Sequence, residues 1–131
     1  MNQQQREWFD ELVDRVVRAL PAEVRALVEQ VPVVIEDIPE EDVLRSLDMP
    51  LDAAEELCGL HTGVARPDAG IEDEVGVPNT VHLYRHGIVS VAGGQAASDE
   101  DIEREIRVTL LHELGHEMGL DEDDLENLGY G

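Results

Sequence analysis

Residues 98–119 (SDEDIEREIRVTLLHELGHEMG) decide how the rest of the sequence is interpreted. Apolar side chains recur there every fourth residue, which is the spacing of one face of an α-helix. The residues on this face are Ile102, Ile106, Leu110, Leu114 and Met118. Ser98 and Asp101 form a capping-box pattern, and Gly119 is typical of a C-terminal helix cap. The stretch therefore predicts one long amphipathic helix that ends near Gly119.

This helix contains the sequence HELGH at residues 112–116. Because four residues make about one helical turn, His112 and His116 project from one face, and both can bind one Zn²⁺. Glu113 lies beside the pair, where its carboxylate reaches a metal-bound water without being a ligand. At ~100° per residue, the histidines lie about 200° around the helix from the nearest apolar residues. The pattern indicates a zinc site on the face that points away from the core.

A catalytic zinc site needs a third protein ligand. Gly119 permits a sharp turn of the chain, and Glu122 follows it by three residues. We therefore expect Glu122 to be the third ligand, with Asp121 as its substitute. The spacing is that of the metzincins with a carboxylate in place of the last histidine. Two histidines and a carboxylate also suit iron, so the donor set leaves the metal open.

The rest of the chain shows helical patterns, then strand patterns, and only then the long helix. The expected helices span residues 3–19, 21–31, 39–47 and 121–128. The expected strands span residues 33–35, 57–64 and 80–85, the last closed by Gly87. Residues 66–79 are expected to form a loop, and residues 92–97 a connector. Because these elements do not alternate as βαβ units, we expect the α+β class with one small sheet.

Charge excludes several classes of partner. The chain of 131 residues has 31 acidic and 9 basic residues and a net charge of −22, so it would repel nucleic acid and anionic membranes. Cys58 is the only cysteine, which fits a reducing compartment. The N-terminal sequence lacks the pattern of a signal peptide, and no apolar run reaches the ~20 residues of a membrane helix. We expect a cytoplasmic monomer that binds neither nucleic acid nor membrane.

Beyond the long helix, several segments resemble the small, single-domain zincin-like metallopeptidases. These are VVIEDIP (33–39), LCGLHTG (57–63), VHLYR (81–85) and RVTLLHELGHEMGLDEDDLENLG (107–129). The resemblance implies one domain over residues 1–131, with a small mixed sheet packed against helices and the active-site helix near the C-terminus. It also implies Zn²⁺ as the cofactor. The implied ligands are His112, His116 and Glu122, and the implied general base is Glu113.

Three polar residues near the third expected strand are further candidates. His82, Tyr84 and His86 alternate, so we expect them to share one face of the strand. They would either line the cleft or form a half-exposed face of the sheet, and the alternation favours the second. Zincins commonly pair one strand edge with an extended peptide, and residues 80–86 are the expected strand. The family often has Tyr near the position of His61.

The leading hypothesis is a zinc-dependent metallopeptidase that cleaves a peptide or protein substrate, with Glu113 as general base. The alternative is a catalytically weak or inactive metal-binding protein that acts as a protein-interaction module. It is motivated by the lack of a methionine after Glu122, where metzincins have a Met-containing turn. A small zinc endoribonuclease is a third hypothesis, and the net charge and the carboxylate at position 122 argue against it.

Overall fold

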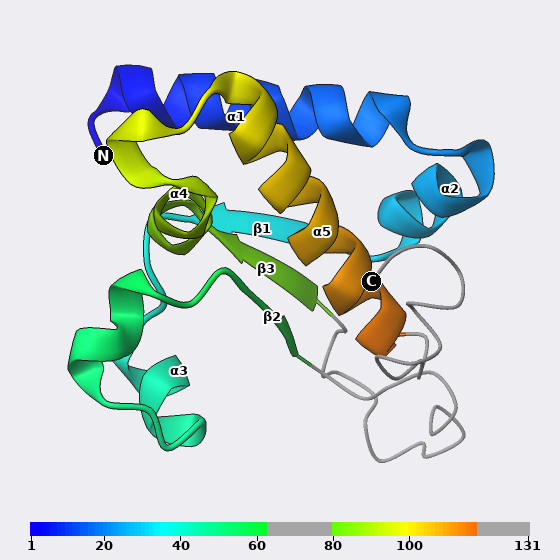
Figure 1. The fold of residues 1–131 in the computed structure, drawn as a ribbon. Helices are drawn as coiled ribbons and strands as arrows, with labels where there is room; N and C mark the ends of the chain where they lie inside the picture. The colour runs from blue at the N-terminus through cyan, green and yellow to red at the C-terminus, as the bar shows by residue number, and fades with distance from the viewer. Residues whose placement is uncertain (63–79, 118–131) are drawn as a thin grey trace, which may run out of the picture.

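The computed structural model describes residues 1–62 and 80–117 (Figure 1). The helices are α1 (Gln3–Ala19), α2 (Ala22–Gln30), α3 (Glu41–Ser46), α4 (Arg85–Ala92) and α5 (Asp99–Glu117). The strands are β1 (Val33–Glu36), β2 (Gly59–Thr62) and β3 (Thr80–Tyr84). Short 3₁₀ helices are η1 (Leu51–Glu55) and η4 (Gly94–Ala96). The predicted α+β class is confirmed, and within the described part no helix is long and apolar enough to cross a membrane.

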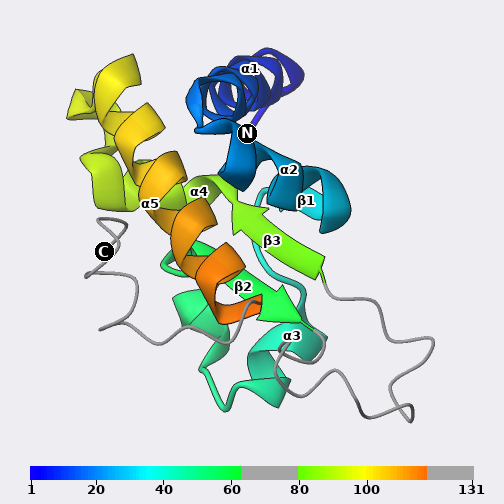
Figure 2. The ribbon, with the colours of Figure 1, turned by 90° about the vertical axis from the view of Figure 1, so that its right-hand side faces the viewer.

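The three strands form one small mixed sheet in the order β1-β3-β2. β1 is parallel to β3, and β2 is antiparallel to it. α5 crosses one face of the sheet beside β3 and β2, and α1 packs against α5 (Figures 1 and 2). Fully buried side chains from α1, β3, α4 and α5 meet in this layer. They include Phe9, Leu12, Val81, Leu83, Ile88, Ile102, Ile106 and Leu110.

The start of α5 follows the predicted capping box. The Asp101 backbone N–H donates to Ser98 Oγ at 3.1 Å, and the Ser98 backbone N–H donates to Asp101 Oδ2 at 3.1 Å. The apolar face of the helix is buried as predicted, including Leu114, which is 3% exposed. The predicted C-terminal cap at Gly119, the position of Met118 and the helical turn at 121–128 lie outside the described residues. So does the predicted loop at 66–79.

The end of the third strand was predicted wrongly. β3 ends at Tyr84, and Arg85 begins helix α4 instead of continuing the strand. Gly87 therefore lies inside a helix, and its lack of a side chain lets the backbone of Leu57 and Cys58 approach the helix closely. A Cβ at this position would lie 2.1 Å from the carbonyl oxygen of Leu57. Because this close contact is with a distant segment, no local pattern of residues 80–92 could indicate it.

A cluster of charged residues holds the start of α4 against α1 and the end of β1. Arg85 is 8% exposed, and its Nη1 donates to Asp37 Oδ1 at 2.9 Å. Its Nη2 also donates to Asp10 Oδ1 at 3.0 Å. Arg6 Nη2 donates to Asp37 Oδ2 at 2.7 Å. These bonds, those of Arg6 first, hold the pKa of the Asp37 carboxyl well below its usual range.

The expectation that residues 80–86 form a substrate-pairing edge is also wrong. β3 is the central strand, and both of its edges are already paired with β1 and β2. In addition, His86 belongs to α4 and not to the strand. Among the described residues, the strand that lies at the sheet edge beside α5 is β2 (Figure 2).

Candidate metal centre

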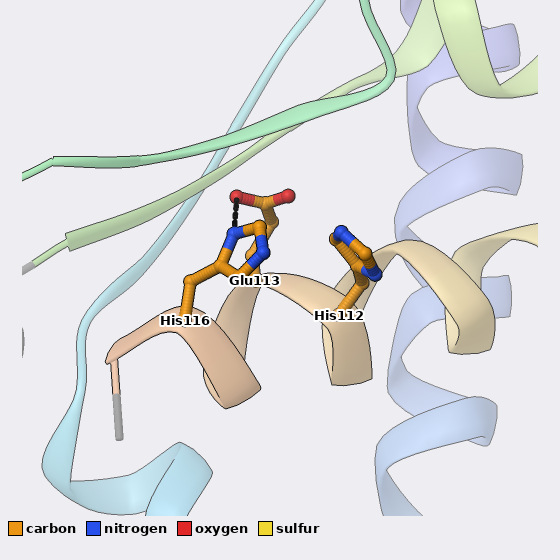
Figure 3. A group of neighbouring side chains, drawn as sticks. All are labelled: His112, Glu113 and His116. Carbon is orange, nitrogen blue, oxygen red and sulfur yellow. Dashed lines mark ion pairs between the residues drawn. The ribbon is translucent and has the colours of Figure 1, made fainter. Parts of the chain in front are cut away.

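The last turns of α5 bring together His112, Glu113 and His116 (Figure 3). One ligand atom from each residue lies within 4.8 Å of one from each of the others. The two imidazole rings are 4.4 Å apart between centroids, and their planes meet at 71°. Helical spacing alone produces this grouping, because residues three and four apart lie on adjacent turns. The helix thus presents two ring nitrogens and a carboxylate on one side.

The three side chains differ in their exposure to solvent. The Glu113 side chain is 13% exposed, whereas the His116 side chain is 40% exposed. Glu113 Oε1 lies 3.6 Å from His116 Nδ1, which is longer than a hydrogen bond. Figure 3 shows the Glu113 carboxylate pointing toward the neighbouring strands, with the His116 ring directly below it in this view and the His112 ring to one side. The carboxylate is therefore the inner group, and His116 is the more accessible one.

Strand β2 packs directly on this part of α5. A Cβ at Gly59 would lie 2.6 Å from Thr109 Cγ2 and 3.4 Å from Glu113 Cγ. Only a residue without a side chain fits there, so the strand covers the aliphatic part of Glu113. In the sequence, Gly59 only weakens the strand expected at residues 57–64, because glycine has no side chain to pack within a strand. Its packing role was missed because it depends on two segments that are 50 residues apart.

The donor atoms of this group fit a zinc ion. Imidazole nitrogen and carboxylate oxygen are common zinc ligands, and two histidines one turn apart bind one ion without distorting the helix. Glu113 is close enough to be a ligand or to lie beside the ion, so the geometry of the described residues is compatible with both roles. The predicted third ligand Glu122 and its substitute Asp121 lie outside the described residues. They therefore stay predictions.

The polar residues of β3 lie on the other side of the sheet. Val81 and Leu83 face the core shared with α5, so the alternating His82 and Tyr84 face away from it. Their rings are stacked 6.2 Å apart. His82 Nδ1 lies 3.2 Å from Glu36 Oε1, and the His82 side chain is 19% exposed. His82 and Tyr84 thus share a face, as expected, but this face is not the one that carries the candidate metal centre.

Tyr84 is fully buried, whereas we expected it on a half-exposed face of the sheet. Its hydroxyl oxygen has no hydrogen-bond partner among the described residues. Burial, with smaller contributions from Glu36, Glu40 and Glu113, raises the pKa of Tyr84 to about 12. The phenol therefore stays protonated at neutral pH.

Comparison with known proteins agrees with this arrangement. A sequence model of the family described as "zincin-like metallopeptidase" matches residues 28–131, which include all three residues of the candidate centre. Among curated proteins, none matches the sequence. The family implies a bound metal, typically zinc, and two histidines and a carboxylate are donors that zinc accepts. The match covers most of the chain, and the α+β fold carries the HELGH sequence on a helix. The chain therefore belongs to the zincin-like metallopeptidase family.

Proposed function

We propose that this protein is a zinc-dependent peptidase that hydrolyses an amide bond in a peptide or protein substrate. One observation carries the proposal: the ligand atoms of His112, Glu113 and His116 lie within 4.8 Å of one another on the last turns of α5. In this proposal His112 and His116 hold the ion, and Glu122 completes the set of protein ligands. When bound, Zn²⁺ supplies Lewis acidity, which polarises a carbonyl group and lowers the pKa of a water molecule.

Glu113 would transfer the proton. Its carboxylate accepts a proton from the attacking water, whose oxygen forms a bond to the carbonyl carbon of the substrate. The same carboxyl then donates this proton to the amide nitrogen as the carbon–nitrogen bond breaks. The products are one carboxylic acid and one amine, and at neutral pH the proton of the acid passes to the amine. The close approach of Gly59 supports this role: a Cβ at this position would lie 3.4 Å from Glu113 Cγ, so the strand leaves the Glu113 side chain little room to move before substrate binds.

The strand that would pair with an extended substrate is β2, in place of residues 80–86. The Tyr84 backbone N–H donates to the carbonyl oxygen of Cys58 at 2.8 Å, so Leu60 is the next residue of β2 bonded to β3. The backbone groups of Gly59 and His61 therefore point toward the outer edge of β2. An extended peptide would add there by backbone hydrogen bonds, close to Glu113.

The test is a Glu113→Gln variant compared with the wild-type protein. Zinc is measured by elemental analysis, and cleavage of a peptide library is followed by mass spectrometry. We expect about one zinc per chain in both proteins, with turnover lower by about 10²-fold or more in the variant, because general-base catalysis is lost. Retained turnover in the zinc-loaded variant would contradict the proposed role of Glu113. Zinc binding without cleavage by the wild type would instead favour a metal-binding interaction module.

A further inference from the structure

His61 lies on β2, the strand that packs on the part of α5 that carries the candidate metal centre. The His61 position pairs with Val81, which is fully buried in the core shared with α5. Gly59, two residues earlier, faces Thr109 and Glu113 of α5. Because alternate residues of a strand face the same side, the His61 side chain also faces α5. It therefore lies on the side of the sheet that carries the candidate metal centre.

The direction of β2 brings His61 toward the end of the site that carries His116. β2 runs beside α5 in the same sense, and it passes over Glu113 toward the His116 end of the helix (Figures 1 and 3). Two strand residues span about 6.6 Å, and four helical residues about 6 Å. As Gly59 lies over the turn that contains Thr109 and Glu113, His61 lies about one helical turn further along.

The ring of His61 is turned into the molecule. The residue is half-buried, and its Nε2 atom is inaccessible to solvent. His61 is not in the described group whose ligand atoms lie within 4.8 Å of one another. An imidazole beside a metal centre, and not bound to it, can donate an N–H to an oxygen atom that approaches the metal. Such donors stabilise the negative charge that develops on a carbonyl oxygen during amide hydrolysis.

We propose that His61 is a substrate-binding residue that donates a hydrogen bond to an oxygen atom of a ligand held at the metal centre of α5. The inference rests on the proposed function, since it needs a metal held by His112 and His116. It adds a residue of β2 to the site. It also gives β2 two roles, because the backbone of His61 faces the outer edge while its ring faces α5.

Cobalt and acetohydroxamate test the proposal without any substrate. The wild-type protein is loaded with Co²⁺, whose visible absorption reports metal binding, and is then titrated with acetohydroxamate, which presents two oxygen atoms to the metal. In a His61→Ala variant we expect unchanged Co²⁺ affinity and acetohydroxamate binding weaker by at least about tenfold, since one hydrogen bond to a charged oxygen is lost. A His61→Gln variant should recover part of the loss, because its amide retains an N–H donor.

The matched control is His82→Asn. It removes an imidazole from the adjacent strand, but on the face of the sheet that points away from α5. Its acetohydroxamate affinity should equal that of the wild type. If the His61→Ala variant does not fold, a His61→Met variant of similar volume and without a donor replaces it in the comparison with His61→Gln.

The other outcomes separate the two proposals. Equal acetohydroxamate affinity in the wild type and the His61→Ala variant would refute the role of His61 and leave the proposed function intact. Loss of Co²⁺ from the variant would also refute it, since His61 would then be a ligand. A wild-type protein that binds Co²⁺ but no acetohydroxamate refutes it too, because no oxygen ligand reaches the metal. Failure of the wild type to bind Co²⁺ overturns the proposed function itself.

Discussion

The close packing of β2 on α5 leads to a quantitative prediction for a Gly59→Ala variant. The added Cβ would lie 2.6 Å from Thr109 Cγ2 and 3.0 Å from the carbonyl oxygen of His82. Carbon atoms in contact are normally about 3.5–4.0 Å apart, so the strand and the helix must separate by about 1 Å. Thr109 is buried and β-branched, so its side chain has few rotamers available within the helix. Overpacking of this kind costs about 1–3 kcal/mol of the free energy of unfolding.

A second variant shows whether the contact with Thr109 causes the loss of stability in the Gly59→Ala variant. Thr109→Ser removes Cγ2, which is the closest atom to the added Cβ. The double variant should lose about 1 kcal/mol less of the free energy of unfolding than the two single variants lose together, because residues in contact are coupled. The recovery should be incomplete, since the carbonyl oxygen of His82 still lies 3.0 Å from the added atom.

The assay is urea unfolding followed by far-UV circular dichroism, for the wild type, both single variants and the double variant. Zinc content is measured on the same samples, because the added Cβ would also lie 3.4 Å from Glu113 Cγ. Two results would refute the reasoning. One is a Gly59→Ala variant as stable as the wild type, and the other is strictly additive effects of the two changes.

Three further predictions concern other parts of the chain. Gly87→Ala places a Cβ 2.1 Å from the carbonyl oxygen of Leu57, and backbone cannot rotate away as a side chain does, so we expect a loss of about 3 kcal/mol or more. A melting temperature within a few degrees of the wild type would contradict this close approach. Asp37→Asn removes a carboxylate whose pKa is lowered by Arg6, so the variant should be less stable at neutral pH. Because the stabilisation from a lowered pKa is lost as pH falls, the difference should shrink between about pH 5 and about pH 2, and a constant difference in urea midpoints would contradict it. Glu122→Ala, purified without added zinc, should contain much less zinc than the wild type by elemental analysis, since a catalytic site needs three protein ligands. Unchanged zinc content would exclude Glu122 as a ligand.

Local patterns predicted most of the helices and strands. The helix of residues 98–119 was predicted from its apolar spacing and its capping box, and α5 begins with both hydrogen bonds of that box. The helix α1 and the strands β1 and β3 were also expected near their observed positions. These features depend on residues within one or two turns of each other, so a single sequence contains them. The grouping of His112, Glu113 and His116 is equally local.

The wrong predictions all involved contacts between distant segments. Arg85 and Gly87 were interpreted as the end of a strand, yet they begin a helix that is held by Asp10, Asp37 and the backbone of Leu57. A strand of Val, His, Leu and Tyr can lie at an edge or in the centre of a sheet, because its own alternation is the same in both places. The central position of β3 follows from its pairing with both β1 and β2.

The sequence by itself determined the chemistry of this protein: two imidazoles and a carboxylate on one helical turn, with a cap at the start of the helix and a buried apolar face. The tertiary structure decided what surrounds that chemistry. It places β2 over Glu113, which is possible because Gly59 has no side chain. It also turns His61 toward α5. The physical reason is the separation in sequence between the residues that contact each other. Helical geometry relates residues three and four apart, whereas close packing between β2 and α5 relates residues 50 apart, and only the folded chain brings them into contact.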